Sequence, residues 1–231
     1  MAVTVGIAGI TSKFARLVLK NLLEQPEVNI WGFCRNPKKL PEHIRLSTCV
    51  TIVARGAGDS SALRHFAKRC DVVICCYLGE TTLMTEGQKL LVEACDEENA
   101  PRYIDSDYCI DFTKLEYGQH PAKDPMKHVK AHLETKQNEC KLSFYGTGVE
   151  VWESTTYATA AEYAIAADRT AVGMLHFLGD RKSIHQIANE FAEVHGRQPV
   201  LNSLGSQDDL YNTIQAAFQK VPSNIFAYLA L

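Results

Sequence analysis

The chain has 231 residues, of which 46% are hydrophobic, and its formal net charge is −3 with a pI near 6.2. These values fit one sizeable globular core, and the charge gives no indication of a nucleic-acid or anionic-membrane partner. No apolar run is long enough to predict a transmembrane helix, and the first residues lead directly into a predicted strand. We therefore expect neither a signal peptide nor a transit sequence, and a cytoplasmic location.

The eight cysteines are scattered among apolar segments and form no Cys-x-x-Cys pair. This pattern is typical of reduced core residues rather than of a disulfide framework. His128 and His132 are four residues apart on a predicted helix, but no third ligand completes a metal set. We predict no metal site.

The first predicted unit is a strand over residues 3–8 followed by a helix over residues 12–24. Gly6, Gly9 and Ser12 recur at intervals of three between them. Small residues let the backbone approach a ligand closely, and a helix start offers free N–H groups and a partial positive charge. A nucleotide pyrophosphate needs both. Because turns with two glycines follow many strands, this turn alone leaves the nucleotide site an open hypothesis.

The second predicted strand, over residues 28–34, ends at Arg35, and Lys38 and Lys39 follow shortly after. In a dinucleotide-binding fold, the residue at this place meets the adenosine ribose. An acid there favours NAD, whereas an arginine can hold the 2′-phosphate of NADP. The alternative is a solvated basic turn. The spacing after the glycine turn favours the phosphate interpretation.

The alternation continues along the chain. Strands are predicted over 49–54, 71–76 and 102–105, and helices over 59–68 and 82–98. The run over 71–76 is predominantly apolar, as in the middle of a parallel sheet, and Asp59 or Ser60 is expected to cap the helix that begins there. Repeated strand–helix units connected by right-handed crossovers predict an α/β fold with a doubly wound parallel sheet.

After residue 110 the pattern loosens. We expect a polar loop over 111–124, helices over 125–134, 156–168 and 183–191, and short strands over 143–144 and 174–178. Ser183 and Gln186 have the spacing of a capping box. We predict a nucleotide-binding domain over 1–144 and a smaller α/β region over 145–231 on the substrate side.

Several motifs, taken in order, resemble the NmrA-like and isoflavone-reductase-like family of atypical short-chain dehydrogenases. They are the Gly6/Gly9 turn, residues 34–40, Gly58-Asp59, residues 71–74, residues 101–107, the Lys127 helix and residues 172–188. The resemblance covers most of the chain and is greatest to reductases of fungal secondary metabolism. It implies a Rossmann fold that binds NADP(H).

The resemblance also implies a set of cofactor-binding positions. These are Gly6, Gly9, Ile10, Thr11, Ser12, Phe14, Arg35, Lys39, Asp59, Ser60, Cys76, Tyr77, Leu78, Gly79 and Ser106. The positions up to Phe14 would surround the pyrophosphate, and Arg35 with Lys39 would hold the 2′-phosphate. Asp59 and Ser60 would lie near adenine. The run from Cys76 would line the nicotinamide half, and Ser106 ends the fifth strand, where ligands bind in such sheets.

The catalytic candidate is Lys127. Reducing members of the family often use a lysine on the helix after the fifth strand, and Lys127 matches it. An ammonium group there could hold the nicotinamide ribose, orient a substrate and donate a proton. The alternative is a surface lysine, and Lys123 and His128 are other candidates for the role.

The leading functional hypothesis is an NADPH-dependent reductase of a small aromatic or polyketide-like metabolite, with hydride transfer to a carbonyl or conjugated double bond. A second is an NmrA-type redox-sensing regulator that binds NADP(H) and a protein partner without turnover. A third is a non-redox isomerase on the same scaffold. The region over 145–231 is shorter than in the family, which favours a regulatory protein partner or a homodimer.

Overall fold

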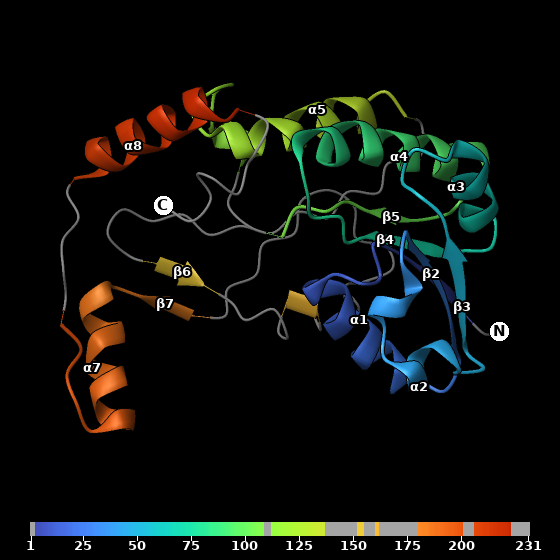
Figure 1. The fold of residues 1–231 in the computed structure, drawn as a ribbon, viewed down its shortest axis with the longest axis horizontal. Helices are drawn as coiled ribbons and strands as arrows, with labels where there is room; N and C mark the ends of the chain where they lie inside the picture. The colour runs from blue at the N-terminus through green and yellow to red at the C-terminus, as the bar shows by residue number, and fades with distance from the viewer. Residues whose placement is uncertain are drawn as a thin grey trace.

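A computed structural model describes residues 3–108, 112–136, 152–154, 160–161, 180–200 and 206–222. Its centre is a parallel sheet with the strand order β3-β2-β1-β4-β5 (Figure 1). The strands are β1 (Val3–Ala8), β2 (Val28–Cys34), β3 (Val50–Ala54), β4 (Val72–Cys75) and β5 (Tyr103–Ile104). Strand order reverses between β1 and β4, so the sheet is doubly wound and the predicted fold class is confirmed.

Helices cover both faces of this sheet (Figure 1). They are α1 (Lys13–Leu23), α2 (Glu42–Arg45), α3 (Ser60–Ala67), α4 (Gln88–Glu97) and α5 (Asp124–Leu133). Helices α1 and α2 lie on one face, and α3, α4 and α5 lie on the other. A π-helical turn over Leu83–Gly87 precedes α4, and short 3-10 turns occur over Pro37–Lys39, Phe112–Lys114 and Pro121–Lys123.

The hydrophobic core forms two layers, one on each side of the sheet. Successive residues of a strand enter different layers because their side chains alternate between the two faces. In β1, Ile7 belongs to the layer that contains Val18 of α1, whereas Ala8 belongs to the layer that contains Phe66 of α3. Both faces are covered, which explains why these strands are nearly continuous apolar runs.

Side chains extend the short pairing between β4 and β5. The Ser106 N–H donates to Gln88 Oε1 at 2.9 Å, and the Ser106 hydroxyl donates to the Tyr77 carbonyl at 2.6 Å. The Tyr108 hydroxyl donates to the Cys75 carbonyl at 3.2 Å. Strand β5 covers only residues 103–104 of the predicted range 102–105, and these side-chain hydrogen bonds hold the chain after it.

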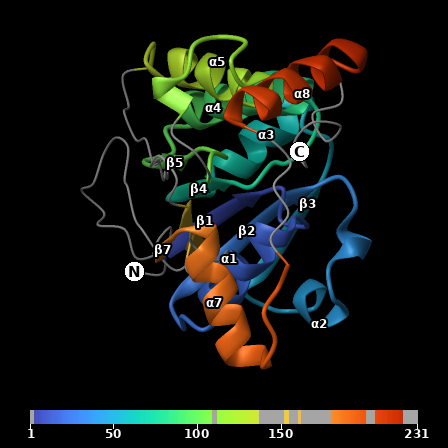
Figure 2. The ribbon, with the colours of Figure 1, turned by 90° about the vertical axis from the view of Figure 1, so that its left-hand side faces the viewer.

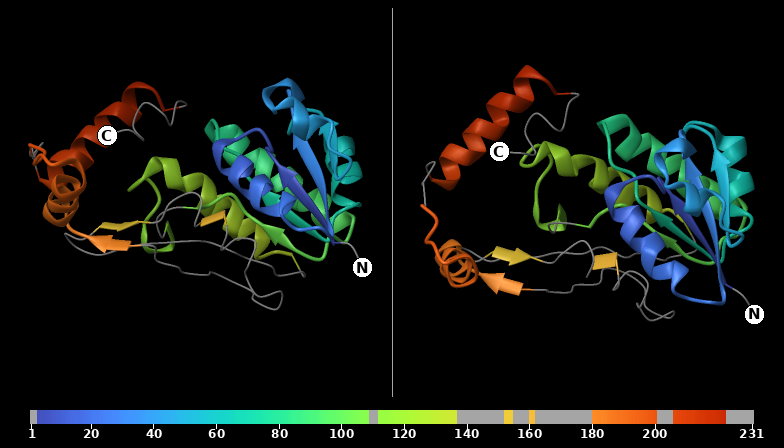
Figure 3. Two further views of the ribbon diagram at one scale, coloured as in Figure 1. Left: turned by 90° about the horizontal axis from the view of Figure 1, so that it is seen from below. Right: turned by 60° about the horizontal axis from the view of Figure 1, so that its bottom comes forward.

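The later part of the chain adds β6 (Trp152–Ser154), β7 (Asp180–Lys182), α7 (Ile184–His195) and α8 (Gln207–Lys220). Strands β6 and β7 pair antiparallel. Helix α8 lies on the same side of the sheet as α5 (Figure 2), and its Gln215 side chain donates to the Gly118 carbonyl, in the turn before α5, at 2.8 Å. Helix α7 and β7 lie at the opposite end of the molecule from β3 (Figure 3).

The predicted capping box of α7 is confirmed. The Gln186 N–H donates to the Ser183 hydroxyl, and the Ser183 N–H donates to the Gln186 side chain. The helix continues past the predicted residue 191 and ends before Gly196, whose φ is +68°. The sequence did not predict β6, β7 or α8.

Other expectations fall outside the described residues. They are the strands predicted over 143–144 and 174–178 and the domain boundary predicted at 144/145. The helix predicted over 156–168 is described only at residues 160 and 161, and both are helical. The six cysteines of the described ranges are free thiols. Within those ranges no helix is both long and apolar enough to cross a membrane.

Candidate functional site

The turn after β1 requires a glycine and leads to the start of α1. Gly9 has a φ of +77°, its N–H donates to the Phe33 carbonyl at 2.8 Å, and a Cβ at this position would lie 2.9 Å from the Cys76 carbonyl oxygen. Only glycine therefore fits without strain. The Ser12 hydroxyl accepts from the Ala15 N–H at 3.2 Å and caps α1. Because α1 begins shortly after the carboxyl end of β1, its start lies at the carboxyl edge of the sheet, where phosphates bind in such folds.

Two adjoining pockets open at this edge. The first has a volume of about 410 Å³ and the second about 590 Å³, and they share Arg35, Ala57, Leu78 and Leu83. The first is lined by Gly9, Thr11, Ser12, Arg16, Phe33, Cys34, Arg35, Lys39, Arg55, Ala57, Cys76, Tyr77, Leu78 and Leu83. The second extends over Gly58 and Gly79 to the π-helical turn. Together they form a cleft of the size that cofactors occupy.

Positive charge dominates the first pocket. Arg16, Arg35, Lys39 and Arg55 line it, and no aspartate or glutamate does. All four side chains are exposed. Within the described part of the chain, the side chains of Arg35 and Lys39 form no hydrogen bond or ion pair, whereas Arg16 Nη2 donates to the Thr11 carbonyl at 3.3 Å. This charge distribution suits a ligand that carries several phosphates.

Thiols form part of the floor of the same pocket. Burial raises the pKa of both Cys34 and Cys76, and the neighbouring Cys75 raises that of Cys76 further. Both thiols are therefore neutral near pH 7. The ionised groups that line the first pocket are all cationic.

The structure brings most of the predicted cofactor-binding residues together. Those that line the cleft are Gly9, Thr11, Ser12, Arg35, Lys39, Cys76, Tyr77, Leu78 and Gly79. They come from the carboxyl ends of β1, β2 and β4, which meet at one edge because the strands are parallel. Their contact with a cofactor stays a prediction.

Three predicted residues of the first unit lie in the core instead. Gly6 is within β1, where a Cβ would lie 2.6 Å from Cys70 Sγ, so this glycine permits close packing of α3 on the sheet. Ile10 is fully buried. The Phe14 ring packs on Tyr108 with their centroids 4.0 Å apart.

Asp59, Ser60 and Ser106 also line neither pocket. Asp59 caps α3, because its Oδ1 accepts from the Ala62 N–H at 3.0 Å, and Ser60 is the first residue of that helix. Ser106 is buried, and its hydroxyl donates to Tyr77. In the loop before α3, the residues that line the cleft are Arg55, Ala57 and Gly58.

Sequence reasoning missed Arg16, Arg55, Ala57 and Leu83 as lining residues. One signal could have found Arg55. It directly follows β3, as Arg35 directly follows β2, and parallel strands bring their carboxyl ends to one edge. Arg16 lies one helical turn after Ser12, which is a weaker signal.

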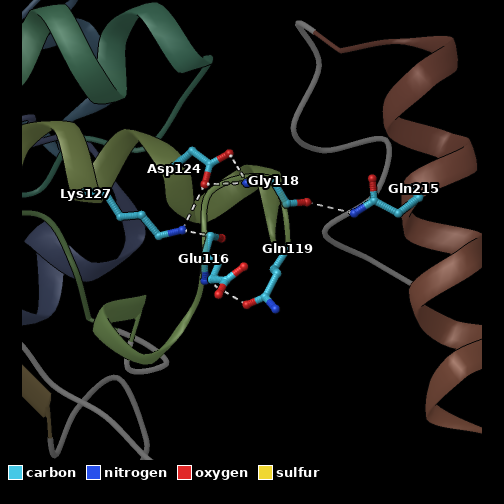
Figure 4. Close-up of polar contacts among 6 residues, drawn as sticks. All are labelled: Glu116, Gly118, Gln119, Asp124, Lys127 and Gln215. Carbon is cyan, nitrogen blue, oxygen red and sulfur yellow. Dashed lines mark hydrogen bonds and ion pairs between the residues drawn. The ribbon is translucent and has the colours of Figure 1, made fainter.

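Lys127, the catalytic candidate, is held by the turn before α5 (Figure 4). Its Nζ donates to the Glu116 carbonyl at 2.6 Å and to Asp124 Oδ1 at 3.1 Å, and it lies 4.7 Å from the centroid of the Tyr117 ring. The Asp124 carboxylate also accepts from the Gly118 N–H. Lys127 lines neither pocket of the cleft, and its catalytic role stays a prediction.

The alternative candidates have other partners. Lys123 Nζ donates to Asp107 Oδ1 at 2.8 Å, and the two side chains are only 6% and 0% exposed. Removing one member of such a buried pair costs about 3–5 kcal/mol, so this contact anchors the start of α5 to the segment after β5. His128 packs on Tyr117 with ring centroids 5.2 Å apart.

Fold and cleft together define a nucleotide-binding protein of the doubly wound α/β class. The family comparison is more specific, because residues 9–138 match the NAD(P)H-binding family. That match spans more than half of the chain, which therefore belongs to this family. A search of curated proteins found no significant sequence match.

Several solved structures are similar in fold. An isoflavone reductase has a TM-score of 0.79 at 14% identity, with 99% of this chain and 87% of that chain covered. The leucoanthocyanidin reductase of Vitis vinifera with NADPH has a TM-score of 0.78 at 15% identity, covering 98% and 84%. The Bordetella bronchiseptica enzyme WbmH with NAD+ has a TM-score of 0.68 at 14% identity, covering 88% and 86%. Because the last two of these structures contain different cofactors, the fold leaves the choice between NAD and NADP open.

Proposed function

We propose that this protein is an NADPH-dependent reductase of a small aromatic or polyketide-like metabolite. The observation that carries the proposal is the basic first pocket, where Arg35 directly follows β2, as a ribose-binding residue does in dinucleotide-binding folds, and no carboxylate lines the pocket. Membership of the NAD(P)H-binding family supports the cofactor class. The same fold occurs in an isoflavone reductase and a leucoanthocyanidin reductase, which supports the reaction class.

The residues of the cleft fit such a cofactor. Gly9 lets the backbone approach the pyrophosphate, and the N–H groups at the start of α1 can donate to it. Arg35 and Lys39 have no competing partner in the described ranges and can bind the 2′-phosphate. When bound, the cofactor supplies the hydride that reduces a carbonyl carbon or a conjugated double bond.

Lys127 is the proposed source of the accompanying proton. Hydride transfer delivers an electron pair to the substrate, and the oxygen or carbon that becomes negative then takes a proton from an acid. The Lys127 ammonium can serve once a substrate replaces its contact with the exposed Glu116 carbonyl. Asp124 would keep that ammonium group oriented.

The proposal also keeps the division into a cofactor domain over 1–144 and a substrate-side region over 145–231. All the residues that line the two pockets lie between Gly9 and Leu90, within the first of these regions. Helix α7 and β7 lie apart from the sheet (Figure 3), which supports a separate role for them.

The test combines cofactor titration with a substrate screen. We expect purified protein to bind NADPH more tightly than NADH and to oxidise it in the presence of an aromatic or polyketide-like ketone or enone. With such a substrate, Lys127→Ala should retain the Kd for NADPH and lower kcat about 10²–10⁴-fold, because a positioned acid is lost.

Lys130→Ala is the matched control, since this lysine lies on the same helix and pairs with Glu134 at its surface. An unchanged kcat in Lys127→Ala would remove Lys127 from the mechanism. Absence of binding to either nicotinamide cofactor would refute the proposed function as a whole.

A second candidate, a redox-sensing regulator, is favoured by the surface of α7. Ile187, Phe191 and Val194 are 42%, 39% and 77% exposed, and their spacing places them on one face of the helix. Such an apolar stripe suits a protein partner. Tight binding of both NADP+ and NADPH without any turnover would support this candidate over the reductase.

A further inference from the structure

Two arginines lie side by side where β2 and β3 end. Cys34 and Ala54 are register partners in these parallel strands, and Arg35 and Arg55 are the residues that directly follow the two strands. The Arg55 N–H donates to the Cys34 carbonyl at 3.0 Å, which continues the ladder by one step. Neighbouring strands are about 4.8 Å apart, so both side chains start from adjacent points, and both line the first pocket.

The Arg55 guanidinium group is held on one side. Its Nη1 donates to the Ala54 carbonyl at 2.9 Å, and its Nε lies 3.7 Å from Asp59 Oδ2. Asp59 is itself fixed, because its other oxygen caps α3 through the Ala62 N–H. Within the described ranges, Nη2 has no protein partner. This edge of the guanidinium group can donate to a ligand.

The contact with Asp59 does not use up the charge of Arg55. The Arg55 side chain is 65% exposed, and an exposed ion pair at 3.7 Å contributes little to stability. Two neighbouring arginines and Lys39 therefore present positive charge to one pocket without a carboxylate in its lining. Such an arrangement suits an anion with more than one negative charge.

We propose that Arg55 binds the 2′-phosphate of NADP(H) together with Arg35 and is a specificity-determining residue of the cleft. This inference rests on the proposed function. A phosphate monoester carries about −1.5 to −2 charges near pH 7, so one guanidinium group leaves it only partly neutralised. The second arginine supplies the remaining charge and further N–H donors. NAD(H), which lacks this phosphate, gains nothing from Arg55.

The experiment measures binding rather than turnover. Isothermal titration compares NADPH with NADH, and 2′,5′-ADP with 5′-AMP, because each pair differs in the 2′-phosphate. The variants are Arg55→Ala, Arg35→Ala and their combination. Arg64→Ala is the matched control, since this exposed arginine pairs with Glu97 at 3.2 Å and lines neither pocket.

We expect Arg55→Ala to raise the Kd for NADPH and for 2′,5′-ADP about tenfold or more, as for other charge-assisted hydrogen bonds. The Kd for NADH and 5′-AMP should stay within about twofold. The combined variant should lose its preference for the phosphorylated ligands, and Arg64→Ala should behave as the wild type. Arg55→Gln repeats the measurement if Arg55→Ala lowers the unfolding midpoint.

Two results would overturn the inference alone. In one, the wild type prefers NADPH but Arg55→Ala matches Arg64→Ala, so Arg35 and Lys39 suffice. In the other, Arg55→Ala weakens both members of each ligand pair equally. A wild type that binds NADPH no more tightly than NADH would refute the NADP(H) proposal together with this one.

Discussion

His120 shows how burial sets the charge of one side chain. It lies directly before the 3-10 turn over Pro121–Lys123, next to the buried ammonium group of Lys123. Burial lowers the His120 pKa below its usual value, and the positive charge of Lys123 lowers it further. The imidazole is therefore neutral in the folded protein at pH values where the same side chain in the unfolded chain is already protonated.

The free energy of unfolding should consequently fall as the pH drops below about 6.5, the ordinary pKa of histidine. In that range the unfolded chain binds a proton at His120 that the folded protein does not bind, and the loss ends below the folded pKa. Urea unfolding at several pH values measures this. His120→Gln should reduce the dependence of the free energy of unfolding on pH. His43→Gln, at an exposed position, should leave this dependence unchanged. Equal slopes in His120→Gln and the wild type would contradict the assignment.

Single residues differed in how far the sequence predicted them. Gly9, Ser12 and Arg35 were placed at the cleft from the sequence, because Gly9 and Arg35 directly follow strands and Ser12 directly precedes α1. Gly6 has the right spacing for a pyrophosphate, but it lies inside β1, where the contact that demands a glycine is Cys70. Residue spacing alone cannot distinguish a glycine required for pyrophosphate binding from one required for close packing in the core. The place of Arg55 directly after β3 was a usable signal, and the register of β2 and β3 adds that Arg55 is the neighbour of Arg35.

At the scale of elements, Gln88 connects two segments that are fifteen or more residues apart. Its side chain is 1% exposed, its Nε2 donates to the Met84 carbonyl at 2.8 Å, and its Oε1 accepts from the Ser106 N–H. Gln88 is the first residue of α4, directly after the π-helical turn. It therefore ties the start of α4 to the end of β5.

Gln88→Leu should lower the free energy of unfolding by about 1–3 kcal/mol, because it leaves the buried Ser106 N–H without its acceptor. Chemical denaturation measures the change. Lys89→Ala is the control, since Lys89 is the next residue and pairs with Glu86 near the surface. A Gln88→Leu variant as stable as Lys89→Ala would show that another group satisfies Ser106.

The sequence predicted elements well where they pack into one of the two core layers. The first four strands and α1, α3 and α5 were found within a few residues of their bounds. Strands β6 and β7 have three residues each, which is too short for a periodic signal. Helix α8 escaped prediction because it buries only one narrow face, formed by Ile214, Ala217 and Phe218 against Ala122.

At the scale of the whole molecule, the cleft and α8 depend on different contacts. Phe218 packs near Ala122, before α5, whereas every residue that lines the cleft belongs to the segment from Gly9 to Leu90. Phe218→Asp places a charge in the α8 contact and should detach the helix. We expect faster proteolysis within 206–222 and a Kd for NADPH within about threefold of the wild type, because the cleft makes no use of this contact.

Phe191→Asp is the matched control, since Phe191 is exposed on α7 and its replacement buries no charge. It should leave proteolysis within 206–222 unchanged. Loss of NADPH binding in Phe218→Asp alone would mean that α8 supports the cleft, and the proposed separation of a cofactor domain from a substrate-side region would then be wrong.

Strands β2 and β3 end at the same register position, and this arrangement affects how the cofactor preference of the protein can evolve. Arg35 and Arg55 stand on the rim, exposed, and neither belongs to the two packed layers. Substitutions at such positions usually alter folding stability by less than about 0.5 kcal/mol. Evolution or protein engineering can therefore change the charge at this edge of the sheet by substituting Arg35 and Arg55 alone, without disturbing the hydrophobic core.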